Sequence, residues 1–118
     1  MGLFSGTKID NPEEYVKEFL FEGETVKCTY KLVRDFVSLT NKRIIFVDKS
    51  LMSRETIIRS IPYSKINSIS VERNKKLFSF SNKVEIIGKG KDYELKISKS
   101  ENVLEFYNTL AESICKGR

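Results

Sequence analysis

The 118-residue chain contains no histidine and no tryptophan, only two cysteines and only two prolines. Without histidine, the chain lacks the commonest zinc ligand, the commonest general base and the usual partner of a catalytic serine or cysteine. Cys28 and Cys115 stand far apart, without the short spacing of a metal site. We therefore expect both cysteines to be reduced, small apolar residues, and we expect neither a metal site nor a cofactor.

The sequence also lacks an apolar run long enough to span a membrane. Its first residues, MGLFSG, have no apolar core of the kind that a secretory signal needs, so a cytoplasmic location is the default expectation. The net charge of +5 comes from 21 basic and 16 acidic residues. The basic residues are scattered along the chain, a pattern that permits contact with an anionic surface but does not favour a nucleic-acid binder.

Catalytic motifs are missing as well. The sequence has no glycine-rich phosphate loop, no nucleophile motif and no pair of carboxylates at an informative spacing. Gly88 and Gly90 suit a turn and not a dinucleotide site. We therefore predict that the protein is not an enzyme.

What the sequence does have is clear periodicity, beginning with a short helix at 11–22. Asn11 suits its N-cap and Pro12 its first position, and apolar residues recur at helical spacing through PEEYVKEFL. A second, longer helix is predicted at 100–116, with Ser100 as its N-cap. Its apolar residues recur at steps of three and four: Val103, Phe106, Tyr107, Leu110 and Ile114.

Between the helices, residues 24–98 alternate between apolar and polar side chains, as half-buried strands do. Seven strands are predicted, at about 25–32, 35–40, 43–48, 55–61, 66–71, 84–87 and 93–97. Closely spaced antiparallel strands must protect their edges by forming a barrel or a sandwich. The expected fold is therefore mainly β, with one domain over 1–118: a seven-stranded half-open barrel capped by the C-terminal helix.

Three stretches resemble a known family: MGLFSG at the start, LTNKRIIFVDK at 39–49 and SIPYSKINSISVE at 60–72. Together they are similar to the small, stand-alone bacterial members of the pleckstrin-homology (PH) superfamily. The resemblance implies a PH-like fold over the whole chain. It also implies assembly into ring-shaped homo-oligomers, and it brings no assigned catalytic activity.

The segment 38–49 predicts a β-hairpin with a polar tip, Thr40-Asn41-Lys42-Arg43. We interpret the tip as turn chemistry, in which Asn41 tolerates left-handed backbone angles and the two basic residues keep the tip in water. A loop of two or four residues gives the same register, with Val37 opposite Phe46 and Leu39 opposite Ile44 on the core face.

The opposite face of that hairpin is unexpectedly apolar, because it carries Phe36, Ile45 and Val47 where a solvated sheet face is mostly polar. Either the helix at 12–20 or a neighbouring subunit must cover it. The helix offers only two turns of apolar surface, so we predict an oligomer interface at these three residues. On this hypothesis, glutamate at position 45 dissociates the oligomer and leaves the monomer folded.

A second candidate site is the loop at 73–82, where basic residues alternate with aromatic ones. Contact with an anionic membrane or another anionic ligand would use Arg73, Lys75, Lys76, Phe78 and Lys83. The alternatives are that Phe78 and Phe80 begin the next strand and point into the core, or that they stack the bases of single-stranded nucleic acid. The short junction at 31–35 does not favour a specific phosphoinositide site.

These observations predict a non-catalytic interaction or scaffold domain that assembles with itself and binds an unidentified protein or ligand. The alternative is peripheral binding to anionic membrane lipids through the basic residues and the 73–83 loop. Nucleic acid is not a favoured partner.

Overall fold

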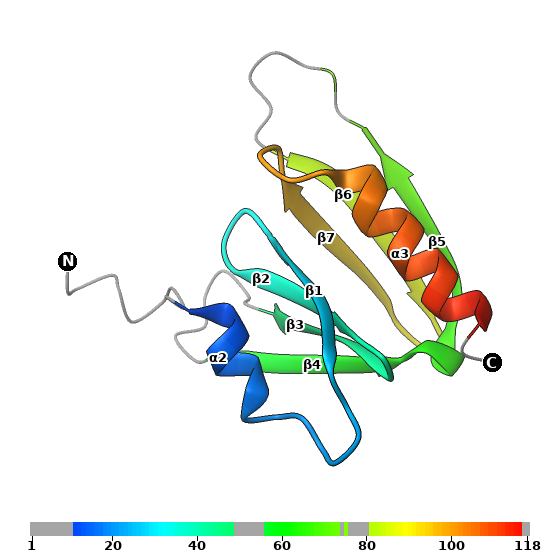
Figure 1. Cartoon of the computed structure of the whole chain (residues 1–118). Coiled ribbons are helices and arrows are strands. Elements are labelled where there is room, and N and C mark those ends of the chain that lie inside the picture. The colour runs from blue at the N-terminus through cyan, green and yellow to red at the C-terminus, as the bar shows by residue number, and fades with distance from the viewer. Residues whose placement is uncertain (1–10, 49–55, 74, 76–80, 117–118) are drawn as a thin grey trace.

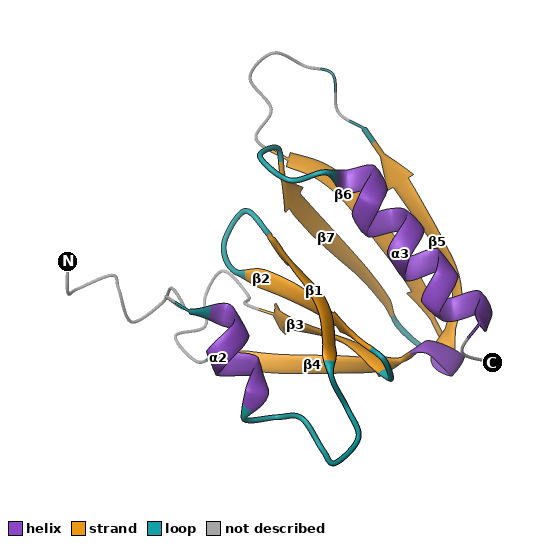
Figure 2. Ribbon diagram, in the orientation of Figure 1, coloured by secondary structure: helices purple, strands orange, loops and turns teal. Residues whose placement is uncertain are grey.

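The computed structural model describes residues 11–48, 56–73, 75 and 81–116 (Figure 1). A short helix is followed by seven strands and a long helix, in the order expected, and a 3-10 turn that was not predicted lies between the fourth and fifth strands (Figure 2). The elements are α2 (Pro12–Lys17), β1 (Val26–Lys31), β2 (Phe36–Thr40), β3 (Arg43–Asp48), β4 (Ile57–Pro62), η1 (Tyr63–Lys65), β5 (Ile66–Glu72), β6 (Ser81–Gly88), β7 (Asp92–Ser98) and α3 (Val103–Lys116). The predicted mainly β fold class is confirmed.

The strands form two antiparallel sheets, one in the order β1-β2-β3-β4 and the other in the order β5-β6-β7. An isolated bridge between Leu32 and Ile97 joins β1 to β7, and η1 carries the chain from β4 into β5. The register of the β2–β3 hairpin is the predicted one, because Val37 pairs with Phe46 and Leu39 pairs with Ile44 across a two-residue loop. Neighbouring strands in each sheet are also consecutive in the chain, so the half-open barrel is built from antiparallel hairpins.

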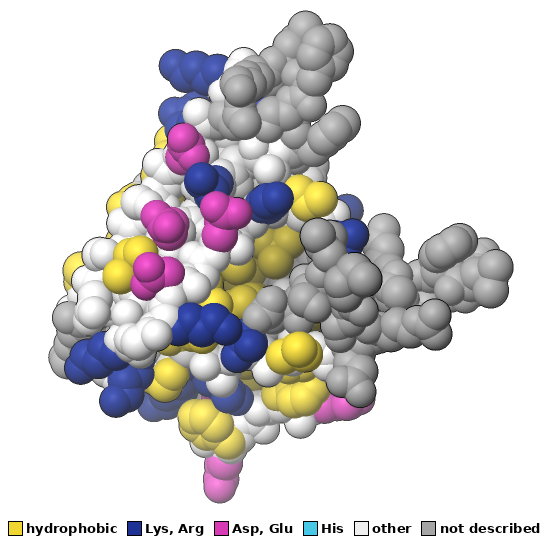
Figure 3. All heavy atoms as spheres, turned by 180° about the vertical axis from the view of Figure 1, so that it is seen from behind, with side chains coloured by type: hydrophobic (Ala, Val, Ile, Leu, Met, Phe, Trp, Pro, Cys, Tyr) yellow, Lys and Arg dark blue, Asp and Glu magenta, His cyan; other side chains and the backbone are white. Residues whose placement is uncertain are grey.

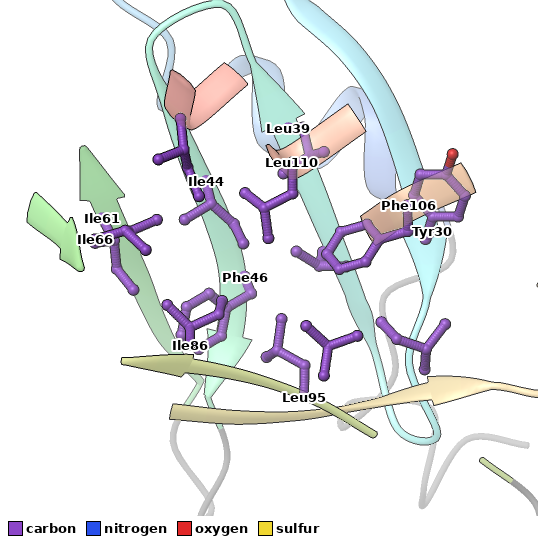
Figure 4. Packing of buried hydrophobic residues seen from close by; sticks show 14 of the residues in the cluster. Tyr30, Leu39, Ile44, Phe46, Ile61, Ile66, Ile86, Leu95, Phe106 and Leu110 are labelled. Carbon is purple, nitrogen blue, oxygen red and sulfur yellow. The ribbon is translucent and has the colours of Figure 1, made fainter. Parts of the chain in front are cut away.

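The main core lies between the two sheets and α3 (Figure 4). Phe106 of α3 is fully buried, and its ring meets that of Tyr30 edge to face at 5.2 Å. The other members come from both sheets and from α3, including Leu39, Ile44, Phe46, Ile66, Ile86, Leu95 and Leu110. The apolar stripe predicted for the C-terminal helix is thus the surface that closes the barrel.

A second, smaller cluster lies on the outside of the first sheet, and it corrects the predicted oligomer interface. Phe36, Ile45 and Val47 are exposed by only 1%, 1% and 6%, because Val16 of α2 packs against them within the same chain. Half-buried Tyr15, Leu20, Val26 and Ile58 complete the cover. The apolar face therefore needs no second subunit, and these three residues are not available for a subunit contact.

Both helices are shorter than predicted, α2 at its C-terminal end and α3 at its N-terminal end. The helix expected over 11–22 ends at Lys17, after which Phe19 and Leu20 continue as turns whose N–H groups bond three residues back. Asn11 caps it as expected, since its side chain accepts from the Glu14 N–H. At α3 the prediction of Ser100 as the cap is wrong, because the side chain of Asn102 accepts the Glu105 N–H at 3.1 Å.

Candidate functional site

A buried ion pair joins the tip of the β2–β3 hairpin to the loop that follows α2. Arg43 lies with Nε 2.8 Å from Oε2 of Glu24 and with Nη2 3.0 Å from Oε1, so the guanidinium binds both carboxylate oxygens. The Glu24 side chain is completely buried and that of Arg43 is 21% exposed. Thr40 adds its hydroxyl, which donates to Oε2 of Glu24 at 2.7 Å. This bidentate geometry holds two segments, nineteen residues apart, in one fixed arrangement.

The electrostatics of Glu24 follow from these contacts. Burial on its own would raise the pKa of the carboxyl, because it penalises the charged form. The hydrogen bonds from Arg43, from Thr40 and from the Phe21 N–H outweigh burial and hold the pKa of Glu24 below its ordinary value. The carboxylate is therefore charged at neutral pH, and the ion pair is intact there.

Asn41 secures the same loop with three hydrogen bonds. Its Oδ1 accepts the Thr25 N–H at 2.8 Å, its Nδ2 donates to the Gly23 carbonyl at 3.0 Å, and its own N–H donates to the Thr25 carbonyl at 3.0 Å. Gly23 has φ of 88°, a backbone angle that favours glycine. The loop at 21–25 is thus fixed from both sides.

The interpretation of the hairpin tip is wrong for Asn41 and Arg43. In the described parts of the chain every residue with a positive φ is a glycine, so Asn41 is not left-handed. Arg43 does not simply point into water, since its Nη2 also donates to the Phe19 carbonyl at 2.7 Å and its Nη1 to Oγ of Ser60 at 3.1 Å. Sequence reasoning missed Glu24 entirely. The signal that was available is an acidic residue two positions before β1 together with an arginine at the start of β3.

The segment 19–25, which Arg43 also holds at the Phe19 carbonyl, presents two large apolar side chains to solvent: Phe19, 39% exposed, and Phe21, 52% exposed. The Arg43 guanidinium lies 5.4 Å from the centre of the Phe21 ring, and the Phe19 ring meets Tyr15 edge to face at 5.5 Å. We call Phe19 and Phe21 the aromatic surface. Exposed aromatic side chains on a fixed backbone are typical of protein contact sites, because little freedom is lost when they are covered.

Charge is distributed unevenly around the aromatic surface. The segment 11–25 holds five glutamates and one lysine, a charge of −4, and since the whole chain has +5 the remaining residues together carry +9. Glu18 and Glu22, both exposed, flank the two phenylalanines in the sequence. Glu24 is neutralised by Arg43, so the acidic character of this surface comes from the exposed Glu18 and Glu22.

A basic corner lies where η1 meets the β6–β7 turn. It consists of Lys65, Lys89 and Lys91, all exposed. The Lys89 N–H donates to the Lys65 carbonyl at 3.2 Å, which ties the two turns together, and Nζ of Lys91 lies 5.2 Å from the centre of the Tyr93 ring. The view from behind shows basic side chains gathered near the lower edge of the molecule, beside exposed hydrophobic ones (Figure 3).

The predicted anionic site at the 73–83 loop falls partly outside the described residues. Lys76 and Phe78 lie outside the described residues, and so does Phe80. Lys83 is engaged on the outer face of the second sheet, where its Nζ lies 3.2 Å from Glu72 and 3.3 Å from Glu94. The hollow of about 300 Å³ beside it takes in neither Arg73 nor Lys75, since its lining is Glu72, Ser81, Lys83, Glu94 and Lys96.

A second hollow, of about 310 Å³, lies beside the C-terminal half of α3. Its polar groups are satisfied within the chain: Nζ of Lys27 donates to Oγ of Ser113 at 3.1 Å, and the Tyr63 hydroxyl donates to the Thr40 carbonyl at 2.6 Å. Burial raises the pKa of Tyr63 to about 12. Lysines at the C-terminal end of a helix complement its negative dipole, so this hollow has a structural explanation.

Membrane-spanning helices and metal-binding clusters are both absent from the described ranges. No helix there is both long enough and apolar enough to cross a membrane. The same ranges hold no cluster of three or more cysteine, aspartate or glutamate side chains arranged to bind a metal ion.

Comparison with known proteins places the chain in a family. Residues 1–114 match the family described as bacterial PH domain. The uncharacterized protein YozO of Bacillus subtilis is 29% identical over 115 residues, which cover 98% of this chain and 99% of YozO. A Shewanella loihica protein with a pleckstrin-homology domain has a TM-score of 0.70 at 21% identity and covers 89% of this chain and 92% of its own. A pleckstrin-homology domain from Shewanella amazonensis has a TM-score of 0.70 at 22% identity, over 90% and 89% of the two chains. The solved structures agree in fold with the two sheets and closing helix described above, and this chain belongs to the bacterial PH domain family.

Proposed function

We propose that this chain is a non-catalytic binding domain that assembles with copies of itself through the aromatic surface. The observation that carries the proposal is that Phe19 and Phe21 are 39% and 52% exposed on a loop that Glu24, Arg43 and Asn41 hold in place. A domain gains little by fixing two large apolar side chains in water unless a partner covers them. The face that the sequence singled out for assembly is covered by α2. The surface proposed here lies on the segment that follows α2 in the chain.

A second copy is the partner that the charge distribution favours. Exposed Glu18 and Glu22 flank the aromatic surface in the sequence, and the whole chain carries +5, so unlike charges can meet when two copies approach. An assembly of this kind repeats each binding site, and a further partner could then be held by several weak contacts at once.

The alternative, peripheral binding to anionic membranes, has less support. Lys83, one of the basic residues that would bind the membrane, already has two carboxylate partners. The exposed glutamates beside the aromatic surface would be repelled by an anionic bilayer. Sedimentation with vesicles of phosphatidylcholine, with and without phosphatidylserine, separates the two functions. Pelleting that depends on phosphatidylserine would favour the membrane.

The proposal is tested by measuring mass with light scattering across a concentration series. We expect the wild type to exceed the 13.7 kDa of one chain, and the double variant Phe19→Ser with Phe21→Ser to return to that mass. The matched control is Val33→Ser with Leu104→Ser, which removes two apolar side chains of similar exposure, 50% and 39%, outside the aromatic surface. A wild type that stays at the mass of one chain, or a control that dissociates as fully as the double variant, would overturn the proposal.

A further inference from the structure

We infer that the aromatic surface of one copy docks against the basic corner of another copy. This inference rests on the proposed self-association and goes further, because it names the second half of the contact. The basic corner consists of Lys65, Lys89 and Lys91, and it is the place where two turns converge.

The first argument is charge complementarity. Glu18 and Glu22 flank the two phenylalanines in the sequence, and both are exposed. At the basic corner three exposed lysines lie on two turns that a backbone hydrogen bond joins, with Asp92 as the nearest acidic neighbour in the sequence. Opposed patches of unlike charge speed encounter and fix the orientation of two partners, and the attraction is lost when one sign is reversed.

The second argument is that both surfaces are held rigidly. The aromatic surface is fixed by the ion pair between Arg43 and Glu24. The basic corner is fixed by the Lys89 N–H bond to the Lys65 carbonyl and by the Gly88 N–H bond to the Lys91 carbonyl, 3.1 Å long. A methyl group at Gly88 would lie 3.5 Å from the Lys65 carbonyl oxygen, which is van der Waals contact, so the two turns touch. Surfaces that are already ordered lose little entropy when they meet.

The third argument is a matching apolar component. Lys91 lies over the ring of Tyr93, which is half-buried, and that ring packs edge to face on Phe46 at 5.5 Å. Arg59 also lies over this ring, 5.8 Å from its centre, so the alkyl stems of these basic side chains form the apolar floor offered to the phenylalanines. The basic corner therefore offers both components that the aromatic surface presents.

The position of the two surfaces in the fold makes mutual contact feasible. Arg43, which holds the aromatic surface, pairs with Pro62 across β3 and β4, and η1 with Lys65 follows Pro62 directly. The acidic and basic surfaces thus belong to the same end of the first sheet. A second copy can then place its basic corner against the aromatic surface of the first copy. The mass of the assembly gives the number of copies that it contains.

The test is charge reversal with complementation. Variant A carries Glu18→Lys and Glu22→Lys, and variant B carries Lys65→Glu and Lys89→Glu. All four positions are exposed, so both variants are expected to fold, which thermal melting checks. Each variant alone is expected to associate about tenfold more weakly than the wild type, or worse, because like charges now face each other. An equimolar mixture of A and B should regain wild-type association, because every contact between A and B joins unlike charges.

The control is Lys31→Glu with Lys75→Glu, which changes the net charge as variant B does but at exposed positions outside the basic corner. It should associate like the wild type. If the wild type associates and the A and B mixture is no stronger than either variant alone, the contact lies elsewhere and this inference fails while the proposed function stands. If the wild type stays at the mass of one chain, both fail.

Discussion

The guanidinium of Arg43 binds both carboxylate oxygens of Glu24, at 2.8 and 3.0 Å, and the Glu24 side chain is completely buried. The two residues come from a hairpin tip and from a loop before the first strand. Their pairing determines how the segment between α2 and β1 leaves the sheet. It therefore determines where Phe19 and Phe21 emerge.

Removing the arginine is expected to destabilise the protein strongly. The Arg43→Ala variant leaves a buried carboxylate without its charged partner, and losing one member of a buried pair costs about 3–5 kcal/mol of unfolding free energy. Arg43→Lys keeps the charge but loses the bidentate geometry, so it should lie between Arg43→Ala and the wild type. The free energy of unfolding of each variant is measured by urea denaturation monitored by circular dichroism. An Arg43→Ala variant within about 1 kcal/mol of the wild type would show that the pair has no structural role.

The same pair predicts a dependence of stability on pH. The pKa of Glu24 is lower in the folded chain than its ordinary value of 4.5, so the unfolded chain binds a proton more readily in acid. The stabilisation is complete above pH 4.5 and is lost as pH falls through the folded pKa. The Glu24→Gln variant lacks this contribution, and its stability should fall less between neutral and acidic pH. Equal losses in both proteins would contradict the assignment.

Ile45 gives a third prediction, and the structure reverses the earlier expectation. With 1% exposure beneath α2, this residue has no room for a charge. The Ile45→Glu variant should unfold or lose more than about 4 kcal/mol, because it buries an unpaired carboxylate. Thermal melting by circular dichroism measures the effect. A variant that melts like the wild type but has a smaller mass would return this residue to a subunit interface.

Much of the fold was predictable from local patterns. The alternation of Val26, Cys28 and Tyr30 specifies a half-buried strand, and the even loop at Asn41-Lys42 fixes the pairing of Leu39 with Ile44. Both signals are contained in a few consecutive residues, and neither depends on how distant segments pack.

The contacts that build the candidate site were not predictable in this way. Arg43 looked like a soluble turn residue, because its partner Glu24 lies nineteen residues earlier in the sequence. The cover over Ile45 was misjudged for a related reason: the helix contributes Val16, and residues after its end and on neighbouring strands supply the rest. The apolar residues of one helix alone cover less of the sheet face than several segments cover together.

The central claim is that the aromatic surface is covered when copies of the chain meet, and the absence of tryptophan makes this directly measurable. A Phe21→Trp variant places the only tryptophan of the chain on that surface, at a position that is 52% exposed in one copy. Its fluorescence is recorded over the concentration range in which light scattering detects assembly. The account predicts that emission moves to shorter wavelength as the mass rises, because the indole leaves water. Emission that stays at the wavelength of exposed tryptophan while the mass rises would contradict it.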